Sequence, residues 1–167
     1  MQVRDRIREL RRVKARDLIP NERNWRLHPP QQADALRGIL AEVGYADALL
    51  VRETPDGLVI IDGHLRAETT PDMEVPVLVL DVTEEEADKL LLTLDPLAGM
   101  ATADTAALDA LLASVQTDSE AVAALLKGLA DANAGPALGP ELNEALAEGV
   151  SLCICAACGH EHAATKA

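Results

Sequence analysis

The spacing of hydrophobic residues along the first hundred positions predicts alternating strands and helices. Imperfect alternation at residues 13–18 predicts a first strand, and the arginine-rich residues 2–12 before it predict a short helix or a disordered arm. Two short apolar runs that flank a Pro-Asp-Gly turn predict a β-hairpin over residues 49–61. The almost continuous apolar run at residues 75–82 is typical of a strand that is covered on both faces.

Helical spacing separates these strands and dominates the second half of the chain. Apolar residues three and four positions apart predict a helix over residues 33–43, with Gly44 as its C-cap. Capping boxes that start at Thr83 and Thr117 predict two further helices. We expect the first of these to end before Pro96, and the second to form an αα-hairpin with the helix that precedes it.

The predicted elements divide the chain into four parts. We expect a basic arm over residues 1–12 and an α/β domain, with a small mixed sheet and packed helices, over residues 13–96. An α-helical extension follows over residues 97–148, and a short cysteine-rich tail over residues 149–167. A length of 167 residues suits one compact domain with an appendage.

Charge is distributed unevenly along the chain, whose formal net charge is −13. Residues 1–37 carry ten Lys and Arg against five Asp and Glu, whereas the rest of the chain is strongly acidic. An acidic body disfavours independent nucleic-acid binding, because contacts with phosphate dominate that binding. The basic arm could still contact DNA, directly or with a partner protein, and a frayed, solvated first turn is the alternative.

The composition also indicates the cellular compartment of the protein. No apolar run reaches the length of a membrane span, so we expect no membrane partner. The charged start lacks the apolar segment of a secretory signal. Three cysteines without such a signal favour a cytoplasmic protein that has no disulfide framework.

The sequence Asp62-Gly63-His64-Leu65-Arg66 follows the predicted hairpin and opens a short helix or turn. A glycine allows the backbone to approach a phosphate closely, and an arginine can form a bidentate pair with phosphate oxygens. His64 could donate to a phosphate or transfer a proton, and Asp62 could hold a metal ion or orient His64. The alternative is an ordinary Asp-Gly turn with a solvated histidine.

Residues 13–96 resemble the amino-terminal domain of the ParB family, whose superfamily includes sulfiredoxin and free-serine kinases. The resemblance depends on the order and spacing of several short motifs. The family's phosphate-binding box reads G-E-R-R-x-x-A, and His64 and Leu65 replace its Glu and first Arg. The matching positions in the opening segment, the helix-strand unit and the box are Pro20, Asn21, Arg26, Gly44, Val51, Gly63 and Arg66.

This resemblance implies a ParB/sulfiredoxin-like fold that binds a nucleoside triphosphate, with Mg²⁺, at its phosphate box. The implied phosphate-binding residues are Asp62, Gly63, His64, Arg66 and Arg26. It further implies a DNA-associated regulatory module of the kind found in phage and mobile elements. The loss of one box arginine puts ParB-like switching by CTP in doubt, and the absence of a cysteine in this loop argues against sulfiredoxin chemistry.

Two other functions stay open. The free-serine kinases of the superfamily carry a D-G-H-H-R loop, which differs from this one only at Leu65. A small-molecule kinase or nucleotide hydrolase of that type would use Glu22 as its base, and the alternative for Glu22 is an exposed loop carboxylate. The third function is a partner-binding module without nucleotide.

The tail contains a spacing that is typical of a zinc knuckle. Cys155 and Cys158 are followed by glycine, and Cys153 with either His160 or His162 could complete four Zn²⁺ ligands. The alternative is an unstructured tail with free thiols. The alanine- and leucine-rich helices and this tail would also suit a homo-oligomer.

Overall fold

The computed structural model describes residues 1–134, 152–154 and 159–163, of which 152–154 and 161–163 are described by their backbone alone. Residues 1–133 form one compact unit and residues 134–167 form a second. The candidate site lies entirely in the first unit. Among the residues that the structure describes, no helix is both long and apolar enough to cross a lipid bilayer.

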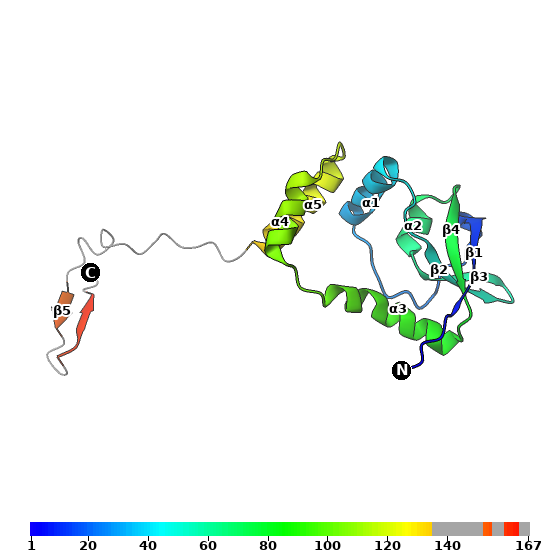
Figure 1. The fold of residues 1–167 in the computed structure, drawn as a ribbon, viewed down its shortest axis with the longest axis horizontal. Helices are drawn as coiled ribbons and strands as arrows, with labels where there is room; N and C mark the ends of the chain where they lie inside the picture. The colour runs from blue at the N-terminus through cyan, green and yellow to red at the C-terminus, as the bar shows by residue number, and fades with distance from the viewer. Residues whose placement is uncertain (135–151, 155–158, 164–167) are drawn as a thin grey trace. The chain divides into compact units, whose positions relative to one another are not determined.

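The first unit contains a mixed four-stranded sheet, as the sequence predicts (Figure 1). The strand order is β1-β4-β2-β3, in which β2 and β4 are parallel and the other two pairs are antiparallel. β4 lies between two partners and is buried along most of its length, in agreement with its continuous apolar sequence. The strands are β1 (Ile7–Lys14), β2 (Leu49–Thr54), β3 (Gly57–Asp62) and β4 (Glu74–Leu80).

The prediction for the amino terminus is wrong. Most of the expected helix or arm is strand β1, and the expected strand at 13–18 is largely a 3-10 turn, η1 (Ala15–Asp17). Charged residues occupy inward-facing positions of β1, which hides the alternation that marks a strand. Arg11, for example, is half-buried and donates hydrogen bonds to Glu9 at 2.5 Å and to Glu53 at 3.3 Å.

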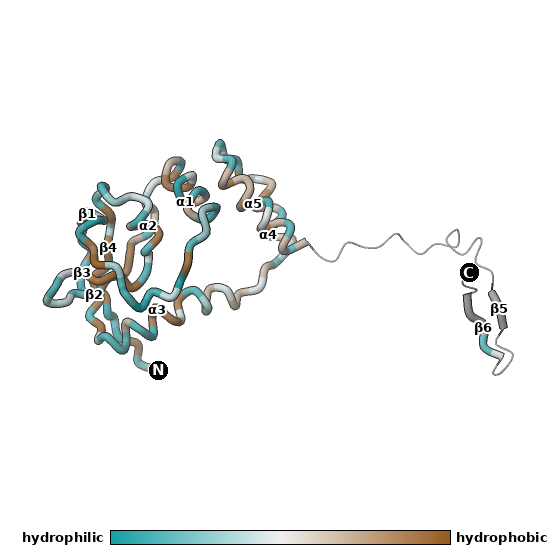
Figure 2. Tube along the Cα trace, turned by 180° about the vertical axis from the view of Figure 1, so that it is seen from behind, coloured by the Kyte–Doolittle hydropathy of each residue, from teal (hydrophilic) through white to brown (hydrophobic). Residues whose placement is uncertain are grey.

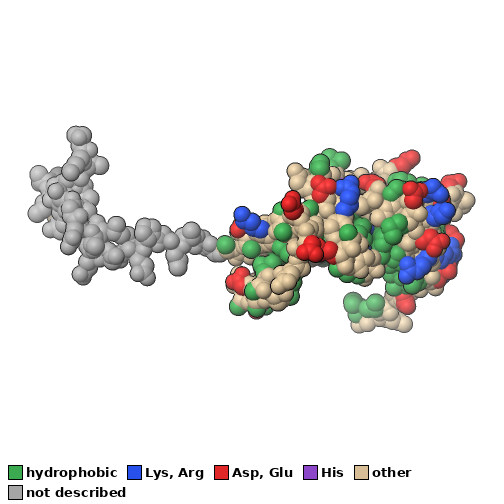
Figure 3. All heavy atoms as spheres, turned by 90° about the horizontal axis from the view of Figure 1, so that it is seen from above, with side chains coloured by type: hydrophobic (Ala, Val, Ile, Leu, Met, Phe, Trp, Pro, Cys, Tyr) green, Lys and Arg blue, Asp and Glu red, His purple; other side chains and the backbone are tan. Residues whose placement is uncertain are grey.

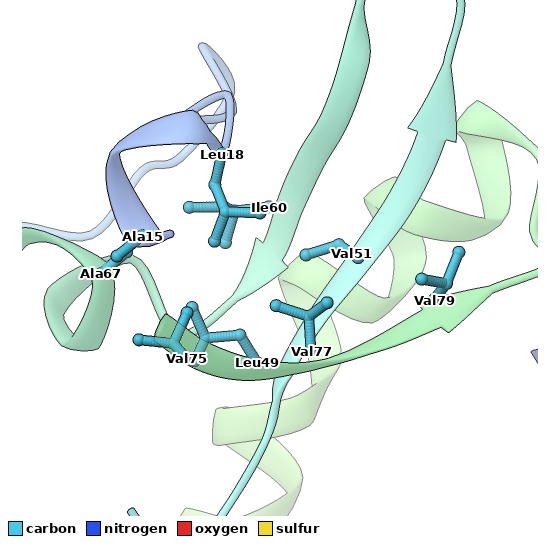
Figure 4. Close-up of a cluster of buried hydrophobic side chains, with 9 residues drawn as sticks. All are labelled: Ala15, Leu18, Leu49, Val51, Ile60, Ala67, Val75, Val77 and Val79. Atoms are coloured by element: carbon cyan, nitrogen blue, oxygen red, sulfur yellow. The ribbon is translucent and has the colours of Figure 1, made fainter. Parts of the chain in front are cut away.

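One face of the sheet carries the larger hydrophobic core (Figure 4). Valine and leucine side chains of β2 and β4 pack with residues of η1, β3 and the short helix α2 (His64–Thr69). Figure 2 shows that hydrophobic residues are concentrated on these strands. The buried members are Ala15, Leu18, Leu49, Val51, Ile60, Ala67, Val75, Val77 and Val79.

The other face packs against α3 (Glu84–Gly99) through a smaller cluster that includes Ile61, Leu80 and Ala87. The predicted capping box is present, since Thr83 accepts from the Glu86 amide and the Glu86 side chain accepts from the Thr83 amide. The predicted end of this helix is wrong, because the helix continues through Pro96. A proline so near the end removes only one intrahelical hydrogen bond.

The remaining helices of this unit are α1 (Pro30–Glu42), α4 (Thr105–Ser114) and α5 (Glu120–Asn133). Gly44 follows α1 with φ +85°, as its predicted role at the end of the helix requires. The capping box predicted at Thr117 is wrong: the Ser119 hydroxyl accepts from the Val122 amide instead.

The second unit contains a short antiparallel pair, β5 (Leu152–Ile154) and β6 (Glu161–Ala163). Cys153 and His162 are register partners in this pair, and His160 is exposed. Cys155 and Cys158 lie outside the described residues. The zinc site therefore remains a prediction.

We predict that Thr83→Ala lowers the free energy of unfolding by about 1 kcal/mol, because it removes the N-cap acceptor of α3. Thr93→Ala is the matched control, since Thr93 lies on the same helix and donates only to the Lys89 carbonyl. Urea unfolding followed by circular dichroism measures both. Equal losses in the two variants would contradict the role of the cap.

Candidate functional site

A sharp backbone bend joins β3 to α2 at Gly63, the N-cap residue of α2. Its φ of +98° lies in the left-handed region, which residues with a Cβ rarely adopt. A Cβ at this position would also lie 2.7 Å from Cγ of Leu49, a fully buried core residue. Both backbone conformation and packing therefore require glycine at the bend.

The Arg66 side chain folds back over this bend from the first turn of α2. Its Nε and Nη2 atoms lie 3.2 Å from the place that a Gly63 Cβ would occupy. Nη1 donates to Asp47 Oδ2 at 2.5 Å, and Nη2 donates to Asp62 Oδ2 at 2.8 Å. The side chain is only 16% exposed. Two carboxylates thus hold the guanidinium beside the bend.

His64 is buried, at 6% exposure, and its Nε2 accepts a hydrogen bond from the Asn21 amide at 3.2 Å. This geometry requires an unprotonated Nε2 and places the proton of the neutral ring on Nδ1. Burial lowers the pKa of the ring below its usual 6.5, against the attraction of Glu68 and Asp62. The alternative of a solvated histidine is wrong, and His64 holds the loop after η1 against α2.

That loop is fastened along one face of α3. Arg23 forms ion pairs with Glu84, at 3.0 Å, and with Asp88. The Trp25 indole donates to the Leu91 carbonyl at 3.5 Å. Arg26 then forms an ion pair with Asp95 and stacks on Trp25, 4.9 Å from the ring centroid. The partners on α3 are three or four residues apart, so they form one stripe that directs Arg26 to its place.

A cavity of about 1300 Å³ lies beside the bend and brings the five predicted phosphate-binding residues together. Asp62, Gly63, His64, Arg66 and Arg26 all line it. Helices α1, α3 and α5 supply mainly apolar residues to the rest of its surface. Those apolar residues are Ala35, Leu36, Ile39, Leu90, Leu91, Leu94, Ala121, Ala124, Leu125 and Leu129.

The charged groups of the lining are mostly acidic. Five carboxylates and two guanidinium groups line the cavity: Asp34, Asp47, Asp62, Asp95, Glu120, Arg26 and Arg66. A free polyphosphate would therefore meet net repulsion, whereas a divalent cation bound with it would find oxygen ligands. The arrangement suits a metal–polyphosphate complex better than a bare anion.

Glu22, the predicted base of an enzyme, is exposed and is not among the residues that line the cavity. Conversely, the sequence analysis missed Asp47 and Asp95, which hold the two arginines. Neither belongs to a motif, and only the fold brings them to the site. Among the described residues, no group of three or more His, Cys, Asp or Glu side chains is arranged to hold a metal ion by itself.

The basic side chains near the amino terminus are largely neutralised within the fold. Figure 3 shows Lys and Arg beside Asp and Glu at the end of the unit that contains the sheet. Ion pairs join Arg4 and Arg6 to Glu86, Arg8 and Arg11 to Glu53, and Arg16 to Asp72. Arg12 and Lys14 form no ion pair with a described residue.

The fold is similar to a crystal structure of the C-terminally truncated chromosome-partitioning protein ParB from Caulobacter crescentus, complexed with CTP-γ-S. The TM-score is 0.52 and the sequence identity is 18%, over 63% of this chain and 60% of that chain. The fold is ParB-like. The chain spans less than two thirds of that ParB structure. No protein-family profile and no curated protein sequence matches the chain.

The bend at Gly63 predicts a measurable difference between two glycines. Gly63→Ala should lower the free energy of unfolding by roughly 2–4 kcal/mol, because it combines positive-φ strain with overpacking against Leu49. Gly44→Ala shares the strain, with φ +85°, but its Cβ would meet nothing within 4 Å. It should therefore lose only about 1–2 kcal/mol in urea unfolding. A Gly63→Ala loss no larger than that of Gly44→Ala would contradict the described packing.

The buried His64 predicts a pH dependence of stability. Because its folded-state pKa lies below the unfolded value of 6.5, the unfolded chain binds the proton more readily. The contribution of neutral His64 to the free energy of unfolding should be fully present above pH 6.5. It should decrease as the pH falls below that value. His64→Gln should lose this component, whereas His28→Gln, which removes only a minor charge effect on His64, should keep most of it. A difference between pH 7 and pH 5 that is the same in wild type and His64→Gln would contradict this account.

Proposed function

We propose that this chain is a ParB-like regulatory module that binds a nucleoside triphosphate, as its Mg²⁺ complex, in the cavity beside Gly63. The observation that carries the proposal is the Arg66 guanidinium, which lies over the glycine bend and lines the cavity. A planar guanidinium suits bidentate recognition of phosphate oxygens. The solved ParB structure with a similar fold was crystallised with a nucleotide analogue, CTP-γ-S.

When the phosphates of a nucleotide bind to Arg66 and Arg26, they must replace the carboxylates that now pair with these arginines. Arg66 now pairs with Asp47 and Asp62, and Arg26 pairs with Asp95. When phosphate oxygens take over the arginines, the released carboxylates would repel the ligand unless a cation neutralises them. Mg²⁺ supplies that charge, and Asp47 and Asp62 are the residues that would hold it, directly or through water.

The proposal concerns binding, and it assigns no base for catalysis. Glu22 lies outside the cavity lining, so no observation favours the kinase or hydrolase alternative. We also propose that the protein associates with DNA, and the exposed Arg12 and Lys14 on β1 are the basic residues that support this association. With most neighbouring arginines paired internally, we propose that DNA is contacted together with a partner protein.

We predict that Mg²⁺–nucleoside triphosphate binding, measured by isothermal titration calorimetry, weakens at least about 30-fold in Arg66→Ala, because a charge-assisted bidentate contact of about 2 kcal/mol or more is lost. Arg16→Ala is the matched control, since Arg16 pairs with Asp72 at the surface and does not line the cavity. CTP, ATP, GTP and UTP are titrated in parallel, with and without EDTA. The proposal fails if wild type binds none of them, or if Arg66→Ala binds as well as Arg16→Ala.

A further inference from the structure

Helix α5 is docked on α1 through a tight contact at Gly38. A Cβ on Gly38 would overlap the Ser119 hydroxyl and lie 2.7 Å from Cγ2 of Val122. Val122 is only 2% exposed and is the buried residue of α5. The two helices therefore approach each other closely where a glycine permits it, and the buried valine fixes the contact.

Glu42, the last residue of α1, holds the segment that leads into α5. Its Oε1 accepts three hydrogen bonds, from the Thr117 hydroxyl at 2.6 Å and from the amides of Asp118 and Ser119 at 3.0 Å each. These bonds, led by that of Thr117, lower the pKa of the carboxyl. A charged carboxylate that accepts from backbone amides just before a helix forms charge-assisted hydrogen bonds, which hold the start of that helix in place.

Apart from Glu120 at its start, the face of α5 that lines the cavity is small and aliphatic. Ala121, Ala124, Leu125, Gly128 and Leu129 follow the three-to-four spacing of a single helix face, and all line the cavity. Lys127, the basic residue of α5, does not line it. This surface can contact an uncharged, apolar part of a ligand through its shape, but it offers no group for a phosphate.

We propose that α5 forms the wall of the cavity that contacts the nucleoside part of the ligand, and that Glu42 is the residue that positions this wall. The inference rests on the proposed nucleotide site and deepens it. The arginines beside the bend bind the phosphates, and α5 adds affinity through contact with the base and sugar. This wall belongs to the same chain as the phosphate site.

Gly128→Leu tests the wall without disturbing its attachment. A Cβ at Gly128 would meet nothing within 4 Å, so leucine can enter the cavity, and it is a better helix former than glycine. Gly99→Leu is the matched control, because a Cβ there also meets nothing and Gly99 does not line the cavity. Circular dichroism and thermal unfolding check that both variants keep their fold.

Calorimetry with two Mg²⁺ complexes separates the parts of the site. Wild type should bind the best nucleotide of the panel about tenfold or more tightly than inorganic tripolyphosphate, since the nucleoside adds contacts. In Gly128→Leu and Glu42→Ala this advantage should disappear, while tripolyphosphate binding stays unchanged. Glu42→Gln, which keeps an acceptor oxygen, should recover most of it, and Gly99→Leu should behave as wild type.

Other outcomes overturn the proposal in distinguishable ways. If wild type binds nucleotides and both Gly128→Leu and Glu42→Ala keep the full nucleoside advantage, the wall is wrong and the phosphate site stands. If the variants lose tripolyphosphate and nucleotide equally, α5 acts on the phosphate end or on the fold as a whole. If wild type binds neither ligand, the proposed function fails and this inference fails with it.

Discussion

The candidate site depends on one interaction, the guanidinium of Arg66 held over a glycine bend by two carboxylates. The bend exists because Gly63 adopts φ +98° against the buried Leu49, where a Cβ would not fit. Asp62 ends β3, and Asp47 precedes β2. The ion pairs therefore connect the sheet to α2 and keep a mostly buried cation beside an open cavity.

The surrounding structure keeps that cation accessible and in place. A neutral, buried His64 accepts from the Asn21 amide, and the loop that follows is fastened along α3. This arrangement brings Arg26 to the same cavity. Both arginines are already paired with carboxylates, so the site is preorganised, and the proposed anion would have to displace these carboxylates. Preorganisation of this kind reduces the entropy lost on binding.

The hydrophobic pattern predicted the central part of the fold well, because the strands there have hydrophobic residues at their buried positions. The hairpin around its Pro-Asp-Gly turn, the doubly covered β4 and the capping box at Thr83 all follow local rules. β1 could not be predicted in the same way, because ion pairs between Arg11, Glu9 and Glu53 replace hydrophobic residues on its inner face. Likewise, Thr117 has the sequence of a cap, but Glu42, distant in the chain, engages its hydroxyl.

The residues that line the cavity also divide into those that local sequence predicts and those that only tertiary contacts bring there. The bend at Gly63 and the arginine beside it could be located from the sequence, because a short motif encodes a local bend. Asp47, Asp95 and the α5 wall could not, because only tertiary contacts bring them to the cavity. The most direct test of the account is an NMR titration of the Arg66 Nε–Hε signal with a Mg²⁺–nucleoside triphosphate. The account predicts a saturable shift of this signal as phosphate replaces the two carboxylates. A ligand that binds while the Arg66 signal stays unchanged would contradict it.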